Sequence, residues 1–168
     1  EAYAKKLITL NLLDQLKQDS KHIVLDDDHL VGFIPYLIVK ELDLSLNQAW
    51  ALASIFTHNK DYLTYYKMFD IILENIDKQG LKKAIEFAIS HGPKSMISIL
   101  EKAISIKDIN HFIVNYAGRA CSIEDAIPVI IHILYHASNF EDALKTNAKV
   151  GGASADRALL IGAILSQV

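Results

Sequence analysis

Apolar residues recur at helical spacing along almost the whole chain, and few residues interrupt that pattern. The 168 residues include only seven glycines and three prolines, the residues that most often end helices and form turns. No segment alternates apolar and polar residues over a length that predicts a β-strand. We therefore expect an all-α fold of about eight to ten helices joined by short connections.

The first part of the chain predicts two helices. Leucines at 7, 10, 13 and 16 share one face of an opening helix that ends near Ser20. Asp27 or Asp28 can cap the next helix, in which Pro35 either starts a fresh first turn or makes a kink.

Polar residues at capping positions predict where later helices begin. Serines paired with a residue three positions on are typical of such starts, and they are Ser45 with Gln48, Ser122 with Asp125 and Ser138 with Glu141. A Tyr-rich helix starts at Asn59 or Asp61, and Gly80 ends it. The sequence thus predicts helices over 49–56, 59–75, 81–90, 93–106, 122–136, from 138 onward and after 152.

Composition limits the class of protein. The length predicts a single all-helical domain, residues 1–168. A net charge of −3, without a Lys/Arg cluster among aromatic residues, favours no nucleic-acid partner. No apolar run approaches the roughly 20 residues of a membrane span, and no signal peptide is recognisable. The single cysteine excludes an internal disulfide and fits the reducing cytoplasm; the oligomeric state stays open.

Two glycines stand near the end of the chain. Gly151 and Gly152 precede small and polar residues, 153–157, and then an apolar helical run. This order predicts a loop that leads into a helix N-terminus, where unpaired N–H groups and partial positive charge favour an anion. The simpler interpretation is a turn in which Ser154 or Asp156 caps the helix.

Residues 147–157, Asn-Ala-Lys-Val-Gly-Gly-Ala-Ser-Ala-Asp-Arg, resemble the C-terminal signature of the ADP-ribosylglycohydrolase family. Residues 121–128 resemble the Cys-His-x-x-x-Ala-x-Pro segment of one branch, and 138–144 resemble its Phe-Glu-Glu-Ala-Leu helix. A looser similarity covers 32–37 and Thr57-His58. The resemblance implies an orthogonal multi-helix bundle of which this chain is the C-terminal portion, without the N-terminal part. The chain also begins at Glu1 within a helical pattern, which fits a partial chain.

The same resemblance implies a function. Members of the family hydrolyse the glycosidic bond of ADP-ribosylated substrates and hold two Mg²⁺ ions, so ADP-ribose is the implied ligand and Mg²⁺ the implied cofactor. The substrate-binding residues implied by the matched segments are Cys121, Asn147, Gly151, Gly152, Ser154 and Arg157. Asp156, at the family's Ser/Thr ligand position, is the one implied metal ligand.

The chain also departs from the family's metal motif. Ala153 and Ala155 stand where that motif has aspartates, and a methyl group cannot coordinate Mg²⁺. The family's Thr-Asp-Asp segment is not recognisable, and the run Asp26, Asp27, Asp28 is either a solvated capping cluster or part of a metal-site rim. Three hypotheses follow: a hydrolase completed by a segment outside this chain, a catalytically inactive relative that binds ADP-ribose or a protein partner, and a scaffold that retains only the fold.

Other candidates have simpler structural interpretations. His132 and His136 have the i, i+4 spacing of a zinc site, but without a metalloprotease glutamate one of them is expected to pack and the other to lie on the surface. Cys121 with His111 suggests a thiol nucleophile but lacks an orienting partner. The stripe Tyr62, Tyr65, Tyr66 and Phe69 is expected to be core. Arg157 is expected to clamp a phosphate or to pair with Asp156 or Glu124.

Overall fold

The computed structural model describes residues 29–54, 57 and 59–168. Within these ranges nine α-helices follow one short 3-10 helix, and the sole β-type pairing is an isolated antiparallel bridge between His29 and Ser122. The elements are η2 (Leu30–Gly32), α3 (Phe33–Glu41), α4 (Leu46–Ala53), α5 (Asp61–Gln79), α6 (Leu81–Ile89), α7 (Ile97–Ser105), α8 (Ile109–Asn115), α9 (Ile123–His136), α10 (Phe140–Val150) and α11 (Ser154–Leu165). The all-α prediction is confirmed. The expected opening helix, the Asp26–Asp28 run and His58 lie outside the described residues.

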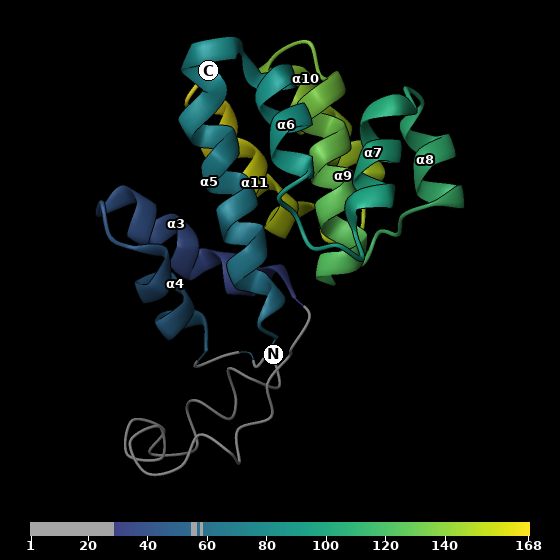
Figure 1. Cartoon of the computed structure of the whole chain (residues 1–168). Coiled ribbons are helices and arrows are strands. Elements are labelled where there is room, and N and C mark those ends of the chain that lie inside the picture. Colours follow the sequence, from purple (N-terminus) through teal and green to yellow (C-terminus); the bar gives the residue numbers. More distant parts are fainter. Residues whose placement is uncertain (1–28, 55–56, 58) are drawn as a thin grey trace.

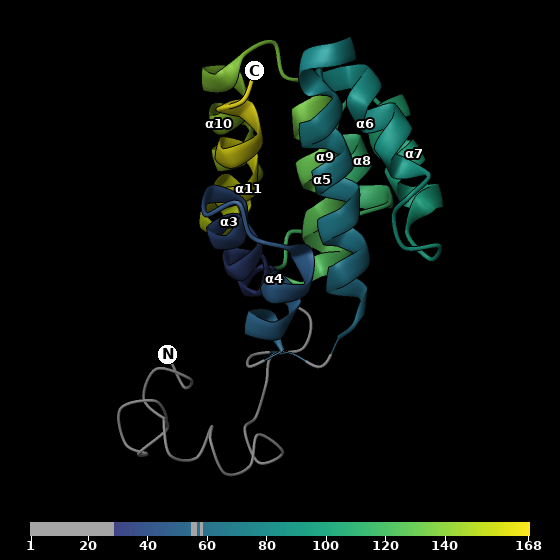
Figure 2. The ribbon, with the colours of Figure 1, turned by 60° about the vertical axis from the view of Figure 1, so that its left-hand side comes forward.

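Helices α6, α7, α8, α10 and α11 pack against α9, while α3 and α4 pack against each other and against α5 (Figure 1). Figure 2 shows α10 and α11 on one side, α5 and α9 in the middle, and α6, α7 and α8 on the other side. Ten of the fourteen residues of α9 are buried, including every residue from Ala126 to Leu134. A helix that is apolar all round is stable only when neighbours cover all of its faces, which places α9 at the centre of the core.

Aromatic residues join α3 to the first half of α5. Tyr62, Tyr65, Tyr66 and Phe69 are all buried, and Phe33 lies against each of them. The hydroxyl of Tyr66 donates to the carbonyl oxygen of Gly32, so its polar end is satisfied inside the core. The interpretation of this stripe as core is confirmed.

Three of the capping predictions are confirmed. Ser45 and Gln48 form a complete capping box at the start of α4, which begins at Leu46 rather than at residue 49. Gly80, with φ of 82°, ends α5. The side chain of Ser122 accepts from the backbone N–H of Asp125 at the start of α9.

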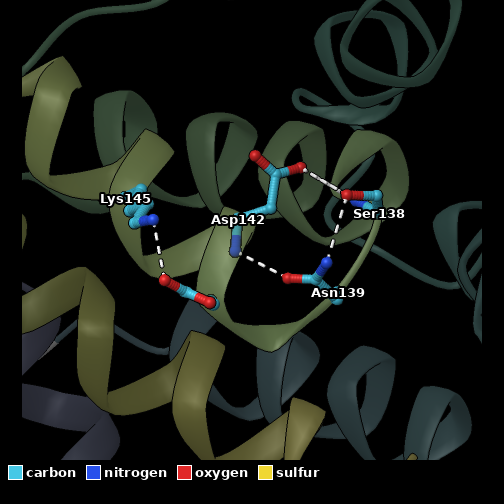
Figure 3. A network of polar contacts seen from close by, with 5 residues as sticks. Ser138, Asn139, Asp142 and Lys145 are labelled. Atoms are coloured by element: carbon cyan, nitrogen blue, oxygen red, sulfur yellow. Dashed lines mark hydrogen bonds and ion pairs between the residues drawn. The ribbon is translucent and has the colours of Figure 1, made fainter.

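The cap predicted for α10 is wrong by one residue. Asn139, not Ser138, is the N-cap, and its Oδ1 accepts from the N–H of Asp142 at 2.9 Å (Figure 3). The Asp142 carboxylate reaches back to accept from both the N–H and the hydroxyl of Ser138, each at 3.0 Å. Both the N–H and the hydroxyl of Ser138 donate to the Asp142 carboxylate, so Ser138 belongs to this network without being the N-cap of α10. Farther along α10, Lys145 forms an ion pair with Glu141 at 2.7 Å.

Two other elements differ from expectation. α7 begins at Ile97 instead of residue 93, because residues 93–96 form a turn in which Met96 N–H donates to the Pro93 carbonyl. The sequence did not predict α8, which Asp108 caps by accepting from two backbone N–H groups. None of the helices in the described part of the chain is both long and apolar enough to cross a bilayer.

Candidate functional site

The Gly-Gly loop is a sharp connection between two antiparallel helices. α10 ends at Val150, and Gly151 and Gly152 follow with φ angles of 72° and 63°. Both angles lie in the left-handed region, which glycine enters without the steric cost that a Cβ imposes. The loop therefore turns within Gly151–Ala153, and α11 starts at Ser154.

A second segment of the chain supports this loop. The N–H of Ala153 donates to the carbonyl oxygen of Arg119 at 3.1 Å. A Cβ added at Gly152 would overlap that same carbonyl oxygen. The glycine therefore allows the backbone of the loop to lie directly against residue 119, which comes from the connection between α8 and α9.

The expected cap of α11 is wrong. The N-cap residue is Ala153, and no side chain caps this helix end. Ser154 and Asp156 fall inside the first turn instead, because the loop uses the Arg119 carbonyl and a Ser154 N–H to Gly152 carbonyl bond of 2.8 Å to close. Because the N–H groups of Ala153 and Ser154 are paired in this way, those of Ala155 and Asp156 are the first-turn N–H groups that no described hydrogen bond uses.

Arg157 holds the loop from the inside. Its side chain is fully buried, Nε donates to Oδ1 of Asn147 at 2.9 Å, and Nη2 donates to the Gly151 carbonyl at 2.5 Å. Asn147 in turn donates from Nδ2 to the Ser154 carbonyl at 2.7 Å. These three bonds tie α10, the loop and α11 together.

Burial disfavours the charged form of the Arg157 guanidinium. Burial lowers the pKa of Arg157, and the negative charge of Asp156 acts in the opposite direction. The Nη1 atom is buried, and no hydrogen-bond partner for it is found among the described residues. The expected ion pair of Arg157 with Asp156 or Glu124 is absent from the described contacts, since the guanidinium bonds to neutral oxygens instead.

The structure separates the predicted site residues into two groups. Asn147 and Arg157 are buried beneath the loop, with exposed fractions of 3% and 0%. Gly152, Ala155 and Asp156 are exposed on the outside of the turn, and Gly151 and Ser154 are half-buried. A ligand at this site would therefore meet the backbone of the turn, the Ser154 hydroxyl and the Asp156 carboxylate before it met Arg157.

The described residues offer little to a metal ion here. Ala153 and Ala155 are the residues on either side of Ser154, and Asp156 is the sole carboxylate from 151 to 157. No group of three or more His, Cys, Asp or Glu residues suited to a metal occurs in the described ranges. One carboxylate leaves Mg²⁺ with far fewer fixed oxygen ligands than its octahedral shell requires.

Cys121 lies near this loop along the chain but faces a different residue. Its Sγ is 3.5 Å from Nδ1 of His29, not beside His111, which is exposed on α8 and stacks edge-on against Tyr116. Cys121 belongs to the same short segment as Arg119, between α8 and α9. Sequence reasoning missed His29 as the partner of Cys121 and Arg119 as the support of the loop.

The histidine pair on α9 follows its simpler interpretation in part, because His132 packs in the core as expected but His136 is half-buried rather than on the surface. His132 is 2% exposed and stacks on Phe112 with ring centroids 5.2 Å apart. Burial, with a smaller contribution from the charge of His136, lowers the pKa of His132 to about 4. His136 is only half-buried and bonds to the Ala103 carbonyl through Nε2 at 3.2 Å.

A separate cavity of about 650 Å³ lies away from the Gly-Gly loop. Its walls come from the start of α6, the α9–α10 connection and the end of α11, and include Leu81, Leu134 and Leu165. None of the predicted substrate-binding residues lines it.

Comparison with known proteins adds no assignment: the chain matches no family model, no curated protein and no solved structure.

Proposed function

We propose that this chain binds ADP-ribose, free or attached to another molecule, at the exposed first turn of α11, and that it does so without hydrolysis. The observation that carries the proposal is the Gly-Gly loop, in which hydrogen bonds from Arg157 and Asn147 hold an uncapped helix end in place. The proposed absence of hydrolysis rests on Ala153 and Ala155, which stand where the family that the segment resembles has metal-binding aspartates.

The uncapped N-terminus of α11 favours a diphosphate as the anchoring group, and the Asp156 carboxylate in the same turn acts against it. α11 has 12 residues, so its N-terminus carries partial positive charge, and the N–H groups of Ala155 and Asp156 are available to a phosphate. No side chain caps that end and competes with a ligand. The exposed Asp156 carboxylate and the half-buried Ser154 hydroxyl are suited to ribose hydroxyl groups beside the phosphates.

The absence of hydrolysis follows from the residue types. Cleavage of a ribosyl bond passes through an oxocarbenium-like state and needs a positioned water, a role that carboxylates or a metal cluster perform. The loop supplies one carboxylate, Asp156. A hydrolase whose remaining ligands come from another segment is the second candidate, and its signature is dependence on Mg²⁺.

Calorimetric titration of ADP-ribose, in Mg²⁺ and again in EDTA, tests the proposal. Equal binding in both buffers is the expected result. Binding that requires Mg²⁺ would favour the hydrolase candidate. The absence of binding in both buffers would contradict both candidates and favour a scaffold that retains only the fold.

A matched pair of variants locates the ligand. Ala155→Glu puts a negative charge in the first turn, where it stabilises a helix but repels a phosphate, and Ala155→Gln adds similar bulk without charge. We expect the glutamate variant to weaken ADP-ribose binding about tenfold more than the glutamine variant. Equal losses would place the ligand elsewhere.

A further inference from the structure

Two residues far apart in the sequence form a thiol–imidazole pair. Cys121 and His29 are 92 positions apart, yet Sγ of Cys121 lies 3.5 Å from Nδ1 and 3.7 Å from Nε2 of His29. No other residue of the chain can supply a thiol, because Cys121 is its one cysteine.

Backbone contacts fix the two residues beside each other. The N–H of Leu30 donates to the Cys121 carbonyl at 3.0 Å, and His29 pairs with Ser122 in the isolated antiparallel bridge. From α5, the hydroxyl of Tyr62 donates to the His29 carbonyl. The contact between thiol and imidazole is therefore set by the fold rather than by two free surface side chains.

The imidazole of His29 lies close enough to the sulfur of Cys121 to exchange a proton with it. A neutral imidazole has one protonated and one unprotonated nitrogen, and both nitrogens lie within 3.7 Å of Sγ. Cys121 also stands two residues before the first residue of α9. Both side chains are partly exposed, so small reagents can reach the sulfur.

We propose that Cys121 is an oxidative modification site at which His29 takes the thiol proton and a hydroperoxide is the oxidant. The sulfur attacks one peroxide oxygen, the O–O bond breaks, and an S–O bond forms to give a sulfenic acid. The departing oxygen receives the proton from His29 and leaves as water or an alcohol. The sulfur is oxidised by two electrons and the peroxide is reduced by two.

This inference is independent of ADP-ribose binding, because neither residue of the pair touches the first turn of α11. The cysteine and the loop are connected only along the backbone, because Cys121 is two residues from Arg119, whose carbonyl accepts the Ala153 N–H. Failure of one proposal therefore leaves the other standing.

The single cysteine makes the test direct. The full chain is treated with hydrogen peroxide and dimedone, which traps sulfenic acid, and separately with iodoacetamide; intact mass follows both reactions. We expect one adduct on the folded protein, none on Cys121→Ser, and rates about tenfold lower in His29→Gln. His111→Gln removes another exposed imidazole and is expected to react as the parent chain does.

Equal rates in the parent chain and in a folded His29→Gln variant would overturn the proposal. Circular dichroism checks that this variant is folded. If it is not, the parent chain alone decides, because its native thiol must then react faster than the same thiol in urea. A native rate at or below the unfolded rate rejects the site.

Discussion

The Nε atom of Arg157 donates to Oδ1 of Asn147 at 2.9 Å, joining α11 to α10 through two buried side chains. Both residues were expected to contact a ligand. In the structure they contact the loop that would present one, since Arg157 also donates to Gly151 and Asn147 to Ser154. The polar side chains of Asn147 and Arg157 thus shape the backbone at the candidate site.

Replacing Arg157 tests this structural role. Arg157→Ala leaves the Asn147 Oδ1 and the Gly151 carbonyl without their donor and opens a cavity, so we expect the free energy of unfolding to fall by about 2–4 kcal/mol. Urea unfolding measures the change. Arg119→Ala is the matched control, because Arg119 is exposed and supports the loop through its carbonyl alone. Similar small decreases in the free energy of unfolding of both variants would contradict a structural role for the Arg157 side chain.

The two glycines of the loop are expected to differ in their tolerance of alanine. At Gly151 a Cβ meets nothing within 4 Å, so the cost of Gly151→Ala is that of its backbone conformation, φ 72° with ψ −161°, about 1–3 kcal/mol. At Gly152 the φ is also positive, and the Cβ overlaps the Arg119 carbonyl. We expect Gly152→Ala to lose at least about 2 kcal/mol more than Gly151→Ala in thermal or urea unfolding. The reverse order would show that residue 119 does not support the loop.

Most of the fold could be predicted because its signals are local. The Ser45–Gln48 capping box and the Gly80 stop act within one helical turn, so the sequence reveals them directly. α8 was missed because its seven residues are too few to show a helical period. At the start of α10 either Ser138 or Asn139 has a side chain that can cap the helix. Asn139 is the N-cap, because the Ser138 hydroxyl donates to the Asp142 carboxylate instead.

The candidate site was predictable only in part, because its contacts are not local. The loop and the helix after it follow from Gly151, Gly152 and the apolar run. The support from Arg119 and the contact between Cys121 and His29 depend on how distant segments pack, with 92 positions between the last two. Nothing in the sequence around Arg157 distinguishes a guanidinium that points inward from one that faces a phosphate.

The buried His132 side chain is expected to make the folded protein less stable in mild acid. Its pKa is about 4 in the folded protein, below the ordinary 6.5, mainly because of burial. As the pH falls, the unfolded chain therefore binds a proton at this histidine before the folded protein does. The free energy of unfolding has its full value above about pH 6.5 and decreases toward pH 4, by up to about 3 kcal/mol. His136, whose pKa burial also lowers, adds to the loss in the same range.

Urea unfolding between pH 7 and pH 4.5 measures this loss, and His132→Leu should flatten the profile. The carboxyls of Asp108 and Asp142 have lowered pKa values because backbone N–H groups bind them, so their contributions disappear only at lower pH. An unchanged slope in the leucine variant would assign the loss to other groups.

Restoring a carboxylate at position 153 tests the family resemblance itself. Ala153 is the uncapped N-cap of α11, so Ala153→Asp should stabilise the helix by about 1 kcal/mol even in EDTA. Ala153→Asn caps equally well but supplies no charge for a hard cation. If the position corresponds to the family's metal ligand, Mg²⁺ should raise the melting temperature of the aspartate variant further, while the asparagine variant and the parent chain stay unchanged. Calorimetric titration with Mg²⁺ gives the affinity directly. Equal responses of the two variants would mean that residue 153 does not stand where the family binds its metal.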